Sequence, residues 1–276
     1  MAYRRIACLS TEAVETLYLL GAEDLIAGIS GFTTRPARAR REKAKVSGFS
    51  SANPDRILAV NPDLVIAFSD LQADIVRDLV GAGVEVHVFN QRDLAGIFRM
   101  IATLAALVEK VEAGARLVAD LQNAVDAARE RARAHADRPR VYFEEWSDPL
   151  IAGIRWVSEL IDAAGGIDCF AEEAHRGAAR ERVISDPAEV IRRAPDIIVG
   201  SWCGRKFQAD RVRGRPGWAA VPAVRDGELY EIKSADILSP GPVAITAGLA
   251  QLERIVERWR ADRVSLHQER RLPDRS

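Results

Sequence analysis

The sequence of 276 residues has few cysteines, no long apolar segment and almost no net charge. Its three cysteines, Cys8, Cys169 and Cys203, are odd in number and widely spaced, which is not the pattern of a disulfide framework and favours a reducing compartment. No run approaches the roughly 20 apolar residues that a bilayer requires, so we expect no membrane-spanning helix. A formal net charge of -1 provides no overall field to attract nucleic acid, which is therefore not an expected partner.

Motifs of the common enzyme classes are also absent. The sequence has no Gly-x-Ser-x-Gly elbow, no His-Glu-x-x-His and no phosphate-binding Gly-Lys-Ser loop. Gly81-Ala82-Gly83 leads into a strand instead of a helix, so it is not a dinucleotide fingerprint. We therefore predict a protein that is not an enzyme and carries no cofactor. One alternative is a hydrolytic enzyme that uses Glu144, Glu145 and Asp148 as acid and base.

Histidine is scarce as well. A zinc or manganese receptor needs several His and carboxylate ligands that converge, but the four histidines lie on different predicted elements without ligand spacing: His87, His135, His175 and His267. No protein-bound metal is expected. His175, in a polar loop, is the candidate for coordinating the metal of a bound chelate.

The composition that remains is that of a folded protein, with 48% hydrophobic and 29% charged residues. Residues 4–9 form an apolar run typical of a buried strand, and helical spacing follows as far as Gly21. Residues 53–68 indicate a short helix, a Pro-Asp turn and another buried strand, before a helix at 73–80 and a strand at 84–89. Successive βαβ units predict a parallel sheet covered by helices.

The unit at residues 53–68 recurs in the second half of the sequence at a constant offset of 133 positions. Pro54 corresponds to Pro187, and Pro62-Asp63 corresponds to Pro195-Asp196. A repeat in the same order and with similar flanking elements indicates two related lobes.

A proline-free stretch at residues 93–136 separates the two repeats. Its apolar residues follow helical spacing and suggest two helices that break near residues 110–114, the second long enough, at about 1.5 Å per residue, to bridge the lobes. The predicted fold is therefore α/β, with two similar lobes whose central sheets are mostly parallel, joined by one long bridging α-helix. The expected divisions are a first lobe at 1–92, a helical segment at 93–137, a second lobe at 138–262 and a polar tail at 263–276.

These segments resemble the helical-backbone class, or class III, of periplasmic substrate-binding proteins, the receptors of ABC importers for cobalamin, iron siderophores and haem. The resemblance covers residues 6–259 and rests on the two repeats, the bridge and the segments 215–218 and 221–227. Residues 144–149, 156–166 and 239–242 resemble the cobalamin-binding branch in particular. The resemblance implies capture of a metal chelate, cobalamin or another corrinoid first and a ferric siderophore or haem second, in a cleft between the lobes.

Ligand contacts are expected where strands end, because strand C-termini and the loops after them face the ligand in such folds. Aromatic side chains there offer flat apolar surface, and arginines offer bidentate donors to anionic groups. The candidates are Phe32, Arg35, Phe49, Phe68, Glu145, Trp146, Asp148, Trp156, Trp202, Cys203 and Arg205.

Receptors of this class dock on the permease through one acidic residue on each lobe. The first of these positions resembles Asp55, but the symmetric position holds Ala188, with Glu189 beside it. An intracellular corrinoid or iron-chelate carrier with the same fold and no permease partner is therefore an alternative. The apolar run after Arg4-Arg5 is too short for a signal-peptide core, so the resemblance implies the periplasm and the written start implies the cytoplasm.

Overall fold

The computed structural model of the chain describes residues 3–48 and 51–269. It divides into two compact units. The first consists of Met1–Gln122 with Ser239–Val243, and the second of Asn123–Leu238 with Ala244–Ser276. A short piece of chain from the second half of the sequence therefore belongs to the first unit.

The first unit is built on a parallel sheet. Its strands are β1 (Ile6–Cys8), β2 (Ile26–Ser30), β3 (Ala44–Ser47), β4 (Leu64–Phe68) and β5 (Val86–Phe89), in the order β3-β2-β1-β4-β5. The strand order reverses between β1 and β4. In open α/β sheets, ligands bind beyond the carboxyl ends of the strands at such a reversal.

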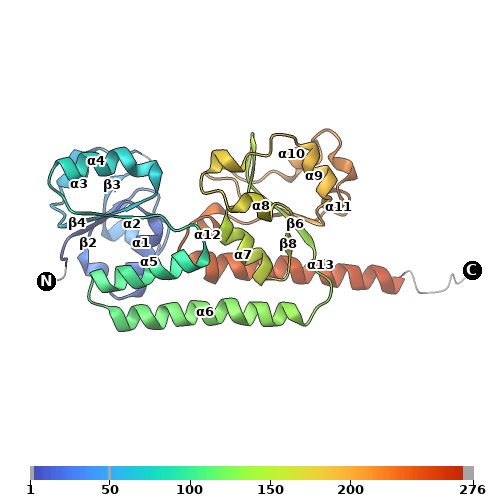
Figure 1. The fold of residues 1–276 in the computed structure, drawn as a ribbon, viewed down its shortest axis with the longest axis horizontal. Helices are drawn as coiled ribbons and strands as arrows, with labels where there is room; N and C mark the ends of the chain where they lie inside the picture. The colour runs from blue at the N-terminus through green and yellow to red at the C-terminus, as the bar shows by residue number, and fades with distance from the viewer. Residues whose placement is uncertain (1–2, 49–50, 270–276) are drawn as a thin grey trace, which may run out of the picture. The chain divides into compact units, whose positions relative to one another are not determined.

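Helices cover both faces of this sheet (Figure 1). On one face, Ile57 of α3 and Leu79 of α4 pack with Val65 and Ala67 of β4, and on the other face α1 packs against α5. The helical elements are α1 (Thr11–Leu19), η1 (Glu23–Leu25), α2 (Ala39–Glu42), α3 (Pro54–Leu58), η2 (Asp70–Gln72), α4 (Ala73–Gly81) and α5 (Leu94–Leu107). The apolar spacing that predicted a helix after residue 93 is the buried face of α5, which includes Leu94, Ile97 and Leu104.

The helix α6 (Val111–Arg133) starts in the first unit and ends in the second. It is one unbroken helix, coloured green in Figure 1. The predicted break before it is confirmed, since α5 ends at Leu107 and Glu109 has a left-handed backbone with φ 56°. The chain thus has the long bridging helix that the sequence predicts.

The second unit has a mostly parallel sheet, as predicted. Its strands are β6 (Arg140–Ser147), β7 (Leu150–Ala152), β8 (Ile167–Asp168), β9 (Ile197–Gly200) and β10 (Leu229–Glu231). The order is β10-β9-β6-β7, and β8 also pairs with β6. Only the hairpin partner β7 runs antiparallel to β6 within the described residues.

The helical elements of the second unit follow from the chain order. They are α7 (Arg155–Ala163), α8 (Ala171–Ala174), η3 (Ala179–Arg182), α9 (Ala188–Arg193), α10 (Ala209–Arg213), η4 (Trp218–Ala220), α11 (Pro222–Arg225), α12 (Ser234–Ile237), η5 (Ala244–Leu249) and α13 (Ala250–Glu269). Because α13 reaches Glu269, the first part of the expected polar tail is helical.

The two units repeat one structural detail closely. Asn61 and Ala194, which are 133 positions apart, both have left-handed backbones, with φ 46° and 44°. Two residues later, Asp63 accepts a hydrogen bond from the Arg5 backbone N–H (2.9 Å), and Asp196 accepts one from the Arg140 backbone N–H (2.9 Å). The Pro-Asp turn therefore caps the start of the neighbouring strand in both units, which confirms the predicted repeat.

Candidate functional site

The carboxyl end of β6 places two glutamates side by side in the second unit. Glu144 is fully buried, and its carboxylate receives both terminal nitrogens of Arg215, at 2.5 and 2.8 Å. The Trp202 indole N–H donates to the same carboxylate at 2.9 Å. A bidentate pair of this kind is strongly charge-assisted, so Glu144 anchors the loop that carries Arg215 to the sheet.

Glu145 has its own arginine. Arg182 is buried and donates to the two Glu145 oxygens at 2.6 and 3.2 Å, and to the Ala152 carbonyl at 2.5 Å. The Glu145 carboxylate therefore spends its acceptors on Arg182. This geometry gives Glu145 a positioning role at the end of β6, and direct ligand contact by Glu145 stays a prediction.

Trp146 is the half-buried aromatic residue at this strand end. Its indole N–H donates to the Asp148 carbonyl at 2.8 Å, and the Arg205 guanidinium lies 4.9 Å from its ring centroid. Arg205 and its neighbour Cys203 are exposed. The hydrogen bond and the cation–π contact fix the indole plane beside an accessible guanidinium. The structure thus brings Trp146, Asp148 and Arg205 together.

The other two tryptophans among the candidates lie in the core of the second unit. Trp202 is 3% exposed and meets Phe207 edge to face, with 5.1 Å between ring centroids. Trp156 is 4% exposed and donates its indole N–H to the Ile237 carbonyl at 2.9 Å. Both rings are covered by protein, so the packing interpretation fits them better than the ligand-binding one.

In the first unit, the candidates follow β2 and β4. Phe32 is 61% exposed, and the loop that carries it is held by Arg40, which donates to the Gly31 and Thr33 carbonyls at 2.6 and 3.1 Å. Phe68 is 7% exposed, and the Arg92 guanidinium lies 5.3 Å from its ring centroid. Phe32 is thus the accessible aromatic candidate described in this unit.

Two further candidates of the first unit need separate mention. Arg35 is half-buried, next to Pro36 in the loop after β2. Phe49 lies outside the described residues. Their assignment to the ligand site stays a prediction.

A cavity of about 520 Å³ opens beside the β6–β7 hairpin, and we call it the hairpin pocket. It is lined by Ser147, Asp148, Pro149, Leu150, Val183, Ile184, Ser185, Pro187, Arg215, Pro216 and Trp218. Of the predicted ligand residues, only Asp148 lines it. Sequence reasoning missed the pocket because its walls come from three segments that are separated by 30 or more positions.

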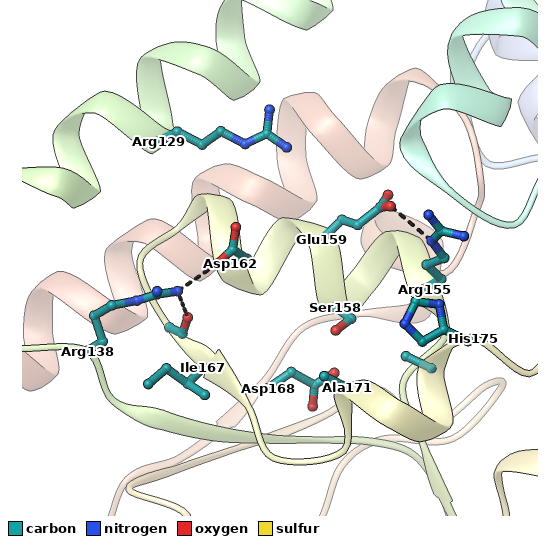
Figure 2. A pocket seen from close by; sticks show the side chains of 12 residues that line it. Arg129, Arg138, Arg155, Ser158, Glu159, Asp162, Ile167, Asp168, Ala171 and His175 are labelled. Atoms are coloured by element: carbon teal, nitrogen blue, oxygen red, sulfur yellow. Dashed lines mark hydrogen bonds and ion pairs between the residues drawn. The ribbon is translucent and has the colours of Figure 1, made fainter.

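A second cavity, of about 510 Å³, lies on the other side of the second unit (Figure 2). One polar face of α7 lines it with Arg155, Ser158, Glu159 and Asp162, and His175 lies beside Arg155. Its charges are largely paired, because Arg155 contacts Glu159 at 3.2 Å and Arg138 contacts Asp162 at 2.7 Å. No predicted aromatic ligand residue lines it, and metal coordination by His175 stays a prediction.

The docking candidates occupy equivalent helices. Asp55 is exposed in the first turn of α3, where the Asn53 side chain accepts from its backbone N–H at 2.8 Å. Glu189 in α9 is paired with Arg192 and Arg193, and hydrogen bonds from these guanidinium groups hold its pKa below the ordinary value. The two carboxylates therefore differ in how freely a partner could reach them.

One buried acidic group was not predicted from sequence. Glu12, in the first turn of α1, is 4% exposed and accepts from the Thr11 hydroxyl at 3.3 Å. Burial raises the pKa of its carboxyl to about 7. It packs on Gly241 of the segment Ser239–Val243, where a Cβ would lie 2.5 Å from the Glu12 Cβ. Its place in the first turn of a helix after a strand was the available signal.

Within residues 3–48 and 51–269, His, Cys, Asp and Glu form no group of three that could hold a metal ion. In the same part of the chain, every helix is too short or too polar to cross a bilayer.

The periplasmic binding protein family matches residues 6–235 of this chain. The chain belongs to this family. Among its relatives, a vitamin B12-binding protein of Vibrio parahaemolyticus is 26% identical over 246 residues, covering 88% of this chain and 86% of the relative. A cobalamin-binding protein of Halobacterium salinarum is 27% identical over 250 residues, covering 86% and 65%. A periplasmic binding protein of this kind is a binding protein by family.

Solved structures of periplasmic binding proteins share the fold. The periplasmic vitamin B12 binding protein of Vibrio cholerae superposes with a TM-score of 0.74 at 20% identity, over 94% of this chain and 98% of that one. A periplasmic heme-binding protein of Roseiflexus sp. RS-1 gives 0.75 at 22% identity, over 93% and 100%. The predicted class of α/β binding fold is confirmed.

Proposed function

We propose that the chain is a solute-binding protein that captures a metal chelate, in the first place a corrinoid such as cobalamin, for an ABC importer. The observation that carries this proposal is the Trp146–Arg205 pair at the carboxyl end of β6, where an indole plane is fixed beside an accessible guanidinium. An indole face offers rigid apolar area to a flat macrocycle. The guanidinium offers bidentate donors to an anionic group such as the phosphodiester of cobalamin.

The names of the relatives support the corrinoid over other chelates. The curated relatives are named for vitamin B12 or cobalamin, whereas the structural neighbours include heme-binding proteins. Haem and ferric siderophores are therefore the second choice of ligand.

Binding without turnover is the second part of the proposal. The hydrolytic alternative needs free carboxyl groups, but Glu144 and Glu145 are each held by both terminal nitrogens of an arginine. A carboxylate held in this way is a poor general base, because proton uptake would break two charge-assisted hydrogen bonds. Only Asp148 of the three acidic groups lacks an ion pair among the described residues.

Calorimetry with cyanocobalamin, dicyanocobinamide, haemin and a ferric hydroxamate siderophore tests the proposal. We expect the corrinoids to bind with Kd of about 1 μM or tighter, and Trp146→Ala to weaken binding about tenfold or more, since the indole buries apolar area worth about 2 kcal/mol. Arg213→Ala is the matched control for Arg205→Ala, because Arg213 is also a solvent-accessible arginine of the second unit, paired with Asp210. If none of the four compounds binds, the proposal is wrong.

A carrier with the same fold and no permease partner is the second candidate, and the state of Glu189 favours considering it. Glu189 is already paired with Arg192 and Arg193, so a permease arginine would have to displace them. For a receptor, Asp55→Ala and Glu189→Ala reduce ligand-dependent binding to the permease without changing ligand affinity. A carrier shows no change with either substitution.

A further inference from the structure

The hairpin pocket differs from the rest of the β6 strand end in its charge. Its one lining cation, Arg215, has both terminal nitrogens committed to buried Glu144. The other ionisable group in its lining is Asp148, whose side chain is exposed and forms no ion pair among the described residues. The pocket therefore presents a carboxylate and no available cation.

The charged groups around the pocket do not change this balance. Arg182 is bound to Glu145, and Arg192 is bound to Asp186 at 2.8 Å, on the residue before the pocket's Pro187. Arg205 lies over Trp146 and is not part of the lining. A carboxylate or phosphate placed in the pocket would thus face Asp148 without a counter-ion, and like charges at an interface cost several kcal/mol.

The remaining lining suits a neutral group. The walls carry Leu150, Ile184 and Trp218, and the hydroxyls of Ser147 and Ser185 add polar atoms that can donate or accept. A volume of about 520 Å³ lies within the range of small-molecule pockets. An amide side chain fits this environment, because its apolar stem packs on the walls while its N–H groups donate to the Asp148 carboxylate.

We propose that the hairpin pocket is a specificity subsite that selects chelates with neutral amide side chains over chelates with carboxylate side chains. The inference rests on the proposed function and sharpens it. Corrinoids carry amides at their periphery, whereas haem propionates and carboxylate siderophores are anionic. Asp148 is then the residue that discriminates between these ligand classes, and Trp146 with Arg205 supplies the common contact surface.

The test compares two ligands that share the cobalt–corrin ring, dicyanocobinamide, which carries amides, and dicyanocobyrinic acid, which carries carboxylates. Calorimetry of the whole chain at pH 7.5 gives Kd for each. We expect wild type to prefer the amide form about tenfold or more, and Asp148→Asn to bring the two values to within about threefold by tightening the acid. Asp148→Lys should reverse the preference.

Asp210→Asn is the matched control, since Asp210 is an exposed acid of the same unit outside the pocket lining, and it should keep the wild-type preference. A second route fills the pocket: Ser185→Trp should weaken cobinamide binding while far-ultraviolet circular dichroism stays unchanged. Equal binding of both corrinoids by wild type, or a preference unchanged in Asp148→Asn, overturns the inference and leaves the proposed function standing. Failure of both corrinoids to bind overturns both proposals.

Discussion

At the scale of single residues, burial decides which polar groups hold the fold together and which remain accessible. Glu144 and Glu145 are neighbours in sequence, yet each is held by an arginine far along the chain, Arg215 and Arg182. Leaving one charge of such a buried pair without its partner costs about 3–5 kcal/mol. Trp146, the next residue, escapes this enclosure and keeps a half-exposed indole beside Arg205.

Glu12 leads to a prediction of pH-dependent stability. Its pKa rises to about 7 in the folded chain, from an ordinary value of 4.5, because burial disfavours the charged form; the Ser10 and Thr11 hydroxyls oppose this shift and the nearby Glu15 charge adds to it. A raised folded pKa means that the folded state holds its proton more tightly, so this contribution to stability is complete below about pH 4.5 and is lost as the pH rises to about 7. The difference amounts to at most about 3 kcal/mol.

Glu12→Gln should therefore remove this dependence. We expect the variant to be more stable than wild type at pH 8 and to differ little from it at pH 4.5, as measured by urea unfolding at both values. Glu112→Gln is the control, because Glu112 is 93% exposed and should show the wild-type dependence. A loss of stability in Glu12→Gln that is equal at the two pH values would contradict the assignment.

At the scale of elements, close approach of helices explains a glycine inside a helix. Gly114 lies in the first turn of α6, and a Cβ there would stand 2.3 Å from the Cβ of Ala105 in α5. Real Cβ atoms do not come so near, so α5 and α6 can pack this closely only where position 114 lacks a side chain. Glycine inside a helix ordinarily costs about 1 kcal/mol relative to alanine, and here packing offsets that cost.

Gly114→Ala should accordingly destabilise the chain, although the substitution favours the helix intrinsically. Thermal unfolding should show a lower Tm, and Ala105→Gly in the same chain should restore part of the loss, because it removes the Cβ that clashes. The control is Gly81→Ala at the end of α4, where a Cβ would meet nothing within 4 Å. An unchanged Tm in Gly114→Ala would show that the helices can move apart without cost.

At the scale of the whole molecule, the two units are joined more than once by the chain. It passes from the first unit to the second through α6, returns for Ser239–Val243 and then enters η5 and α13. In the first unit, this returning segment is held by Gln91, whose amide donates to the Pro240 carbonyl at 2.8 Å, and by Glu15, which accepts from the Val243 backbone N–H at 3.2 Å.

Ligand binding should appear as added stability of the folded chain. A compound that binds only the folded state at 100 times its Kd raises the free energy of unfolding by about 2.7 kcal/mol. Cyanocobalamin at that excess should therefore raise the Tm in a scanning experiment. Trp146→Ala at the same ligand concentration should show a smaller rise, and an identical rise in both proteins would argue against contact at Trp146.

The sequence by itself determined the class of fold, because its signals are local. The run of apolar residues in β1 and β4, the helical spacing in α5 and the Pro-Asp turn each act over a few neighbouring residues. The repeat at 133 positions needed only comparison of the sequence with itself, and Asn61 and Ala194 show how faithfully the structure follows it. These features led correctly to two related α/β lobes, a bridging helix and a binding protein.

Only the tertiary structure decided which candidate side chains are accessible. Glu145 meets its partner Arg182 across 37 positions, and Glu144 meets Arg215 across 71, so no local pattern could reveal that these carboxylates are already paired. The burial of Trp156 and Trp202 and the packing of Glu12 on Gly241 depend on distant segments in the same way. Local spacing fixes the helices and strands, whereas accessibility and charge at a site depend on which distant segments fold against it.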